Sequence, residues 1–428
     1  LDADITGDCR VDFGDLTVFA FYWLEPPGTE ADLVGGDGVD MADFAALARN
    51  WDRKRSAVVI NEIHCNPDVK TELVEFVELF NRTEHDLDIG GWYFSDGISY
   101  TFPAGTILPS HGYLVVAQTP SQLRSKFGTP ANQIYGPFAG KLAGEGERVV
   151  LRDSTGERID RLDYRLGFPW PIVGDPVPYR ETPNGTGHSM QLVHEYIDND
   201  LGGSWRSAYP TPARRNSGVY TTNPPPHLRQ LEHWPEQPRS NEPVAITVKI
   251  TDDDGVARAY LRYQVVEPGS YISIKDSLYQ NRWTQVPMYD DGTNGDVEAG
   301  DDVFTAVLPA SVQSHRRLVR YRIIATDRTG RSIQAPYSDD PQPNFAYFVY
   351  DGVPPWRGAI KPGDPGPMGE VVEYGTDVLT SVPVYHLLSK KSDIEHCTWF
   401  DKYKGSDYKW YLSLIHISEP TRPLYISY

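Results

Sequence analysis

The residues best suited to chemistry are oxygen-bearing side chains that recur at regular spacing near the start of the chain. A loop of twelve residues can give a calcium ion six to eight oxygens when positions 1, 3, 5, 7, 9 and 12 carry donors. Counted from residue 4, every one of these positions has a donor, with position 7 contributing its backbone carbonyl. The donors are Asp4, Thr6, Asp8, Arg10, Asp12 and Asp15. Their types and order predict a calcium site in this segment, which we call loop 1 (residues 4–15).

A second acidic loop repeats the first after 28 residues. The identities in this register pair Asp4, Gly7, Val11, Asp12, Asp15, Ala20 and Trp23 with Asp32, Gly35, Val39, Asp40, Asp43, Ala48 and Trp51. The second segment, loop 2 (residues 32–43), has Val34 and Gly36 at positions 3 and 5, so it offers fewer side-chain ligands. A one-residue slip would bring Asp37 to position 5. An alternative for both loops is that the aspartates only cap helices and fill turns.

Each loop leads into a segment with apolar residues at helical spacing. The two stripes are Leu16, Phe19, Ala20, Trp23 and Leu24, and Phe44, Leu47, Ala48 and Trp51. This spacing predicts two helices that pack through Phe19, Trp23, Leu47 and Trp51. Asp at position 12 and the short repeat resemble dockerin repeats more than calmodulin-type EF-hands, although Cys9 stands where a Gly is usual. The resemblance implies calcium as the cofactor and a cohesin-like protein or a cell-surface component as the partner.

From residue 58 the pattern changes to short β-type runs between turn residues, as in Val58–Ile63, Leu73–Phe80, Gly112–Ala117 and Arg148–Arg152. Several segments of 58–217 together resemble a bacterial lamin-tail domain: VVINEI (58–63), VEFVELFNRT (74–83), DLDIGGWYFSDG (86–97), YTFPAGTILPSHGYLVVA (100–117), GERVVLRDSTGERIDRLDY (146–164), GHSMQL (187–192) and SWRSAYPTPARRNSG (204–218). The resemblance implies an immunoglobulin-type β-sandwich used for attachment or spacing.

A second β region follows the proline-rich stretch 222–226. Alternating runs at Val244–Ile250, Ala259–Val266 and Val319–Thr326 resemble immunoglobulin-like or fibronectin-like domains of surface proteins. Between them, residues 288–302 crowd acidic side chains that either bind a second calcium ion or form turn hydrogen bonds. The sequence leaves both interpretations open.

The last part of the chain has a different character. Residues 371–401 resemble the opening of a spore-coat-type (CotH) atypical kinase domain, with strands expected at Val371–Glu373 and Val382–Leu388. The kinase residues of that family would lie beyond them. Residues 412–428 resemble a translated sequencing adapter, and we expect them not to be natural sequence. The start at Leu1 leads us to expect that the true N-terminus is missing.

Composition restricts the function further. The net charge of −19 argues against nucleic-acid binding, which needs clustered Lys and Arg. No apolar run approaches the length of a membrane span. The three cysteines, Cys9, Cys65 and Cys397, do not define a disulfide framework, so we expect packed or free thiols.

No hydrolase motif appears, and Glu62, His64, Glu75 and Glu78 are expected to be exposed strand residues instead of catalytic groups. The sequence thus predicts a mainly β chain without catalytic residues: a dockerin-like EF-hand repeat pair (1–55), two immunoglobulin-like β-sandwiches (56–220 and 221–352), a truncated CotH-like start (353–411) and the artefact (412–428). The expected function is calcium-stabilised adhesion or scaffolding in a secreted or surface protein. The alternative is the accessory part of a CotH-type kinase or of a dockerin-bearing carbohydrate-active enzyme.

Overall fold

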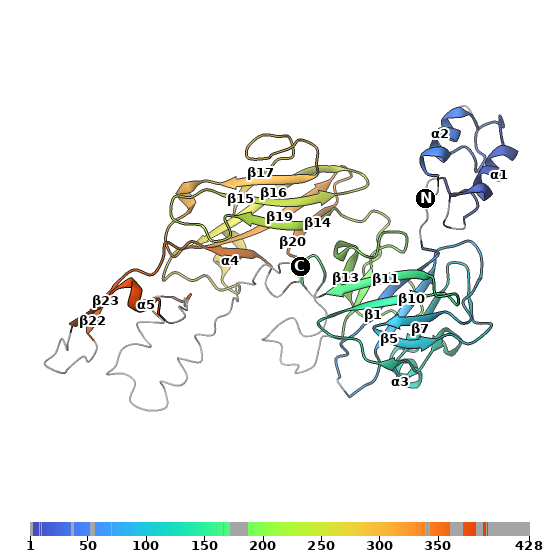
Figure 1. The fold of residues 1–428 in the computed structure, drawn as a ribbon, viewed down its shortest axis with the longest axis horizontal. Helices are drawn as coiled ribbons and strands as arrows, with labels where there is room; N and C mark the ends of the chain where they lie inside the picture. Colours follow the sequence, from blue (N-terminus) through green and yellow to red (C-terminus); the bar gives the residue numbers. More distant parts are fainter. Residues whose placement is uncertain are drawn as a thin grey trace. The chain divides into compact units, whose positions relative to one another are not determined.

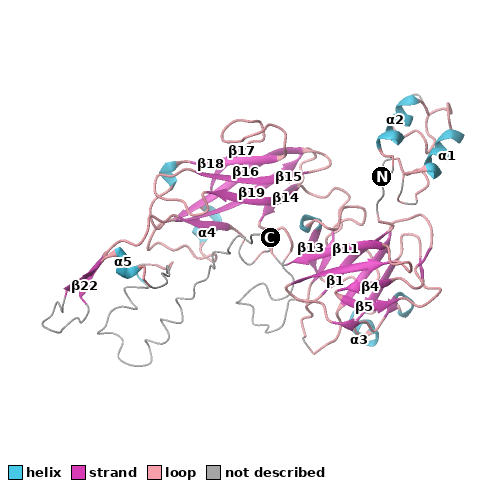
Figure 2. Ribbon diagram, viewed as in Figure 1, coloured by secondary structure: helices cyan, strands magenta, loops and turns pink. Residues whose placement is uncertain are grey.

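The computed structural model describes residues 3–7, 9, 11–35, 38–51, 56–69, 71–165, 167–171, 187–338, 340, 343–359, 371–381, 388–390 and 392. The chain divides into two compact units, residues 1–224 and 225–428. Strands dominate both units, and helices are few and short (Figures 1 and 2). The mainly β fold predicted from the sequence is therefore confirmed.

The first unit begins with a small helical lobe made of α1 (Phe13–Phe21) and α2 (Met41–Arg49). Each helix starts at a capping box, with Asp12 and Asp15 at α1 and Asp40 and Asp43 at α2. In each box the N-cap carboxylate and the carboxylate of the third helical residue bind backbone N–H groups that the helix leaves unpaired. The core of this lobe consists of Ala3, Val11, Phe19, Ala31, Val39 and Leu47.

The rest of the first unit is a two-layered β-sandwich. Its strands are β1 (Val58–His64), β2 (Phe76–Asn81), β3 (Leu87–Asp88), β4 (Tyr93–Asp96), β5 (Ile98–Thr101), β6 (Ile107–Leu108), β7 (Tyr113–Ala117), β8 (Ile134–Tyr135), β9 (Ala139–Gly140), β10 (Gly146–Arg152), β11 (Arg158–Arg165), β12 (Ser189–Leu192) and β13 (Trp205–Ala208). One sheet has the order β13-β12-β1-β2-β7-β8 and the other β11-β10-β4-β5-β9, while β3 and β6 form a separate pair. The short helix α3 (Pro120–Phe127) covers part of the six-stranded sheet.

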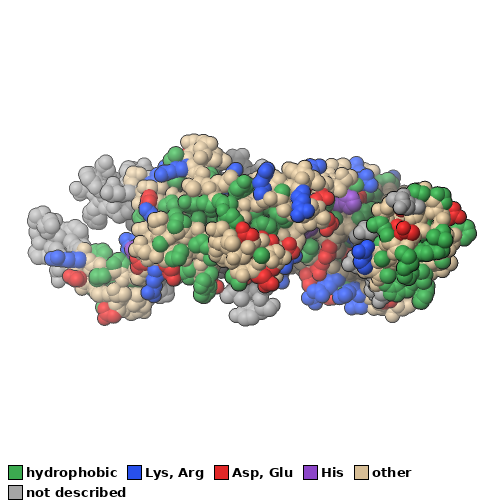
Figure 3. Space-filling model, turned by 90° about the horizontal axis from the view of Figure 1, so that it is seen from above, with side chains coloured by type: hydrophobic (Ala, Val, Ile, Leu, Met, Phe, Trp, Pro, Cys, Tyr) green, Lys and Arg blue, Asp and Glu red, His purple; other side chains and the backbone are tan. Residues whose placement is uncertain are grey.

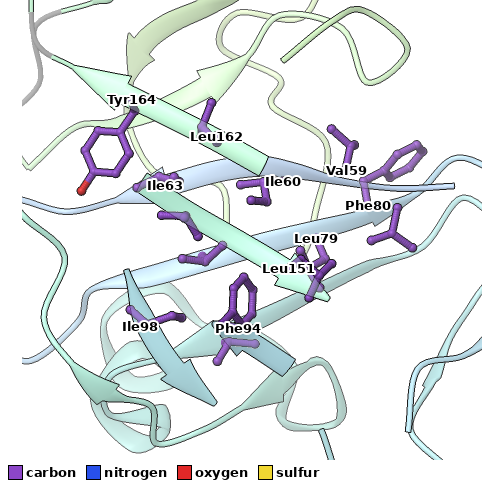
Figure 4. Close-up of a cluster of buried hydrophobic side chains, with 14 of the residues drawn as sticks. Val59, Ile60, Ile63, Leu79, Phe80, Phe94, Ile98, Leu151, Leu162 and Tyr164 are labelled. Atoms are coloured by element: carbon purple, nitrogen blue, oxygen red, sulfur yellow. The ribbon is translucent and has the colours of Figure 1, made fainter. Parts of the chain in front are cut away.

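The core of the sandwich lies between these two sheets. Ile60, Ile63 and Leu79 from one sheet meet Leu151 and Leu162 from the other (Figure 4). Every residue of β1 and β2 is buried, because the outer face of the six-stranded sheet is covered as well.

The second unit has its own pair of sheets. Its strands are β14 (His227–Trp234), β15 (Val244–Thr251), β16 (Val256–Val266), β17 (Thr284–Met288), β18 (Val303–Leu308), β19 (Leu318–Asp327), β20 (Ser332–Ala335) and β21 (Phe345–Phe348), with α4 (Ser277–Asn281) between β16 and β17. One sheet has the order β14-β15-β18 and the other β17-β16-β19-β20, with β21 also paired to β19. Burial alternates strictly along β15, as the period-two pattern of Val244–Ile250 predicts.

After this sandwich, β22 (Trp356–Ala359) pairs with β23 (Val371–Tyr374), and α5 (Thr376–Leu379) follows. The strand expected at Val371–Glu373 is thus present. Residues 382–387 of the next expected strand, 393–401 of the CotH-like segment with Cys397, and 412–428 lie outside the described residues. None of the helices in the described part of the chain has the length and apolarity that crossing a bilayer requires.

Candidate functional site

Loop 1 is organised around the carboxylate of Asp15, which is fully buried at the start of α1. Its Oδ1 accepts hydrogen bonds from the Thr6 backbone N–H at 3.0 Å and from the Thr6 hydroxyl at 3.1 Å. Its Oδ2 accepts the backbone N–H of Asp12 at 2.8 Å, and Asp12 in turn accepts the N–H of Gly14 at 2.7 Å. The carboxylate at position 12 therefore ties positions 3 and 9 of the loop together.

Loop 2 repeats the backbone hydrogen bonds of this arrangement, while Val34 lacks the hydroxyl of Thr6. The Asp43 carboxylate, 2% exposed, accepts the backbone N–H groups of Val34 at 2.9 Å and Asp40 at 3.0 Å. Asp40 accepts the N–H of Ala42 at 2.6 Å, which matches the cap of loop 1. Burial favours the neutral form of Asp43, but the backbone hydrogen bonds together outweigh it and lower its pKa.

The aspartates at position 1 of the two loops, Asp4 and Asp32, accept different backbone N–H groups. Asp4 Oδ2 accepts the N–H of Cys9 at 2.8 Å, and Cys9 itself has a φ of 67°. The turn usually made by Gly thus forms with Cys in the left-handed region, at a cost of about 1 kcal/mol. Asp32 Oδ2 accepts the N–H of Gly28 at 3.1 Å, while its Oδ1 is buried without a hydrogen-bond partner. A buried carboxylate oxygen without a partner fits a cation.

Three of the sequence-predicted ligands, Asp8, Arg10 and Asp37, lie outside the described residues. The described aspartates of loop 1 (Asp4, Asp12 and Asp15) and of loop 2 (Asp32, Asp40 and Asp43) turn oxygens toward nearby backbone N–H groups, and Thr6 donates to Asp15. Their hydrogen-bonding agrees with the capping alternative and also with a preorganised calcium loop. Among described residues, the acidic group whose oxygens lie within 4.8 Å of one another is elsewhere, in the second unit.

That group consists of Asp252 and Asp254 in the β15–β16 turn and Asp327 at the end of β19. Sequence analysis missed it, because its members lie in two separate hairpins whose only local signals are the turns TDDDG and TDRTG. Asp252 accepts the N–H of Asp254 at 2.9 Å, and Asp327 accepts the N–H of Arg331 at 2.8 Å. Burial raises the pKa of Asp252. These are turn hydrogen bonds, so the group does not by itself indicate a metal.

The acidic segment 288–302 is also held by turn hydrogen bonds. Asp290 accepts the N–H of Gly300 at 2.9 Å, Asp296 accepts that of Gly292 at 2.8 Å, and Asp291 accepts that of Thr293 at 3.0 Å. Burial raises the pKa of Asp290. Of the two interpretations left open by the sequence, these bonds favour the turn.

The helical lobe leaves much of its apolar surface uncovered (Figure 3). Phe19 and Leu47 are buried as predicted, but Trp23 and Trp51 are each 39% exposed and Leu24 is 74% exposed. The predicted packing through Phe19, Trp23, Leu47 and Trp51 is therefore complete only at Phe19 and Leu47, while the two tryptophans contact the rings of Phe19 and Phe13 and stay partly exposed. Two nine-residue helices bury only the central residue of each stripe. The large apolar side chains left exposed on this lobe are Phe13, Phe21, Trp23, Leu24, Val34, Met41, Phe44 and Trp51.

The expectation that Glu62, His64, Glu75 and Glu78 are exposed is also wrong. Glu62, His64 and Glu78 are 0% exposed and Glu75 is 3% exposed. Glu75 is covered where it accepts the N–H of Leu142, and His64 where it packs against the rings of Phe76 and Phe127. For Glu62 and Glu78 the cause is a segment far along the chain, residues 209–216, which we call the closing segment. Its Thr211 and Ala213 donate backbone hydrogen bonds to Glu62 and Glu78. Enclosed in this way, the acids have no open surface on which to meet a substrate.

Comparison with known families adds to the assignment of the first sandwich. Residues 52–165 match the family model of the lamin tail domain. The lamin-tail resemblance predicted from the sequence, with its immunoglobulin-like β fold, is thereby confirmed. The match ends at the last residue of β11, and the sandwich continues beyond the matched residues with β12, β13 and the closing segment.

No curated protein matches the chain. A similar solved structure is that of a purple acid phosphatase from yellow lupin (Lupinus luteus) seeds, with 9% sequence identity, 71% of this chain covered and a TM-score of 0.22. The chain spans 43% of that structure's own chain. A TM-score this low carries no argument about fold or activity.

Proposed function

We propose that the chain is part of a secreted or cell-surface protein whose helical lobe binds calcium and docks onto a partner, while its β-sandwiches attach or space the parts around it. The observation that carries this proposal is the repeated loop geometry. In both loops the last carboxylate is buried and accepts the N–H groups of positions 3 and 9. Such a loop has its backbone arranged before any ion binds.

Calcium suits this geometry for an electrostatic reason. Buried carboxylates are normally paired with a cation or a metal. Among the described residues, no Lys or Arg forms an ion pair with Asp15 or Asp43. The hard oxygen donors at the other loop positions are the type that calcium prefers. The residues that would hold the ion are those of loops 1 and 2, with loop 1 having the fuller set.

The exposed apolar side chains of the lobe support the docking half of the proposal. Phe13 is 73% exposed and Met41, its counterpart in the repeat, is 64% exposed. Phe13 and Trp51 form an edge-to-face ring pair at 5.2 Å, so this surface combines both repeats. Contiguous exposed apolar patches mark interaction sites. The partner that the dockerin resemblance implies is a cohesin-like protein.

The test compares the same loop position in the two repeats. Asp4→Asn and Asp32→Asn each remove a charge at position 1 but keep an oxygen for the backbone N–H that the aspartate accepts. We expect Asp4→Asn to weaken the tighter calcium-binding event by roughly tenfold or more, and Asp32→Asn to leave it nearly unchanged. Titration calorimetry of the full chain measures both. At a hundredfold excess of calcium over Kd, the lobe should gain about 2.7 kcal/mol of stability.

Two outcomes would contradict this proposal. Equal losses from both substitutions would show that loop 1 is not the better site. Identical melting curves of the wild-type chain in calcium and in chelator would show that neither loop uses the ion for stability.

A further inference from the structure

Two glutamates from neighbouring strands meet on the outer face of the six-stranded sheet. Glu62 of β1 and Glu78 of β2 are direct register partners in the antiparallel ladder. Both side chains are 0% exposed. Directly opposed residues in such a ladder have their Cβ atoms about 5 Å apart, so the carboxyl groups share one buried space. Two carboxylates in this position cannot both ionise without a large electrostatic penalty.

Glu62 is surrounded by hydrogen-bond donors. Its Oε1 accepts the Thr211 N–H at 2.9 Å and the Gln191 side-chain amide at 3.2 Å, and also accepts the Ser189 hydroxyl. Its Oε2 accepts the Thr211 hydroxyl at 3.0 Å. Burial raises the pKa of Glu62, but each of these hydrogen bonds comes from a donor and acts in the opposite direction, toward the ionised form.

Glu78 has fewer donors and one neighbour that would accept a proton. Its Oε2 accepts the N–H of Ala213 at 2.6 Å, and its Oε1 lies 2.8 Å from the side-chain amide of Asn61. The Asn61 Oδ1 is buried without a partner. Turning the amide over would let this oxygen accept a proton from a neutral Glu78, since the two ends of an amide are assigned from their contacts. The proton of the pair therefore belongs on Glu78.

The closing segment depends on both acids. Thr211 is bound by Glu62 and Ala213 by Glu78. Ala213 has a φ of 64°, a left-handed conformation that costs an alanine about 1 kcal/mol and needs external support. Asn216 fixes the end of the segment by donating to the backbone oxygens of Asn61 and Leu192.

The remaining titratable and charged groups around the pair do not neutralise it. On β1, burial lowers the pKa of His64 to about 4, so this ring is neutral. On β7, the Tyr113 hydroxyl donates to Glu195 at 2.6 Å, and burial with that neighbouring acid raises the pKa of Tyr113. From the closing segment, Arg215 pairs with Glu195 at 3.1 Å and not with Glu62 or Glu78.

We propose that Glu62 and Glu78 form a pH-sensitive latch, in which one proton on Glu78 holds the closing segment over the sheet and its loss releases that segment. When the proton is lost, the closing segment moves away from the sheet, because the outer side of this segment is already exposed at Arg214 and Arg215. Lifting it admits water to both carboxylates, while the two strands keep their ladder. The latch lies outside the helical lobe and is independent of the calcium proposal.

The direction of the pH effect follows from the pKa values. Burial raises the pKa of both glutamates above the ordinary 4.5, and the charge of Glu62 raises that of Glu78 further. The closed form binds a proton that the open form releases. The stabilisation is therefore complete below about pH 4.5 and declines as the pH rises through the pKa of the pair. In that range the open fraction should grow roughly tenfold per pH unit.

Tryptic cleavage after Arg214 and Arg215 in the full chain measures the open fraction, with rates normalised to a free peptide at each pH. We expect the wild-type rate to rise roughly tenfold per unit between pH 6 and the pKa of the pair. In Glu78→Gln the amide stands in for the protonated acid, so the rate should stay low and flat. Glu75→Gln is the matched control: Glu75 is a buried acid that accepts the N–H of Leu142 instead, and its variant should keep the wild-type slope.

A flat wild-type profile, or a Glu78→Gln profile with the wild-type slope, would overturn the latch. If Glu78→Gln does not fold, hydrogen exchange of the wild-type amides of Thr211 and Ala213 decides the question. After correction for intrinsic exchange rates, the protection of these two amides must fall as the pH rises. The protection of the Ile60 and Leu79 amides should stay constant. Protection that falls equally at all four amides would contradict the proposal.

Discussion

Trp205→Ala should lower the free energy of unfolding of the first β-sandwich by about 3–5 kcal/mol, the range for a large aromatic side chain removed from a core. Trp205 is 0% exposed and heads the fully buried side chains of the described residues by volume. Its indole N–H donates to the backbone oxygen of Asn199 at 2.7 Å, and its ring lies 6.4 Å from that of Trp170. The substitution leaves a cavity and an unpaired carbonyl.

Scanning calorimetry of the full chain can measure this effect, because two compact units should give separable transitions. One transition should fall by at least about 6 °C, while the transition of residues 225–428 stays in place. Trp234→Ala is the control, since Trp234 is 73% exposed and its loss should change stability little. Equal effects of the two substitutions would show that Trp205 does not support the core.

The strands could be predicted from sequence wherever one face meets a core and the other meets solvent. In β15, Val244, Ile246 and Val248 are fully buried while the residues between them are not. The period-two pattern follows directly from the alternation of side chains along a pleated strand. It therefore does not depend on the rest of the fold. The capping boxes of α1 and α2 are likewise local and were visible as the repeated aspartates.

Burial of polar residues could not be predicted in the same way. In β1, Glu62 and His64 stand where an exposed face would place polar residues, yet both are fully buried. The donors to Glu62 are Thr211, 149 residues away in the chain, and Ser189 and Gln191, which are 127 and 129 residues away. The Asp252–Asp327 group depends on long-range pairing too, because the β16–β19 ladder brings its two hairpins to one end of the sheet. Local patterns carry no information about such pairs.

The exposure of the helical stripes has another origin. Apolar residues at i, i+3, i+4 and i+7 indicate which residues share one face of a helix. They do not indicate how much of that face is covered by another helix. Phe19 and Leu47 fill the small core, and the ends of the stripes at Leu24 and Trp51 reach beyond it. Short helices in a lobe of about 50 residues have too little opposing surface to cover both stripes. The uncovered ends are therefore the surface that the proposed docking would use.

Arg320→Ala should destabilise the second unit by about 3–5 kcal/mol, since it combines a cavity with unsatisfied acceptors. Arg320 of β19 is 0% exposed. Its Nη1 donates to the backbone oxygen of Ile272 at 2.8 Å and to Gln264 Oε1 at 3.2 Å. Its guanidinium also lies 5.2 Å from the ring centre of Tyr271 and 5.4 Å from that of Tyr279. One side chain thus connects β19 to β16, to the loop after β16 and to α4.

The same calorimetric experiment tests this second effect, and here only the transition of residues 225–428 should move. Arg320→Lys keeps the charge but loses the planar guanidinium that lies against the rings of Tyr271 and Tyr279, so its shift should fall between those of wild type and Arg320→Ala. Arg258→Ala removes an exposed arginine from the neighbouring strand β16 and should change the transition by less than about 0.5 kcal/mol. A shift for Arg320→Ala no larger than that of Arg258→Ala would mean that the loop and α4 are held by the apolar contacts of Tyr279 and Ile272 instead of the buried guanidinium.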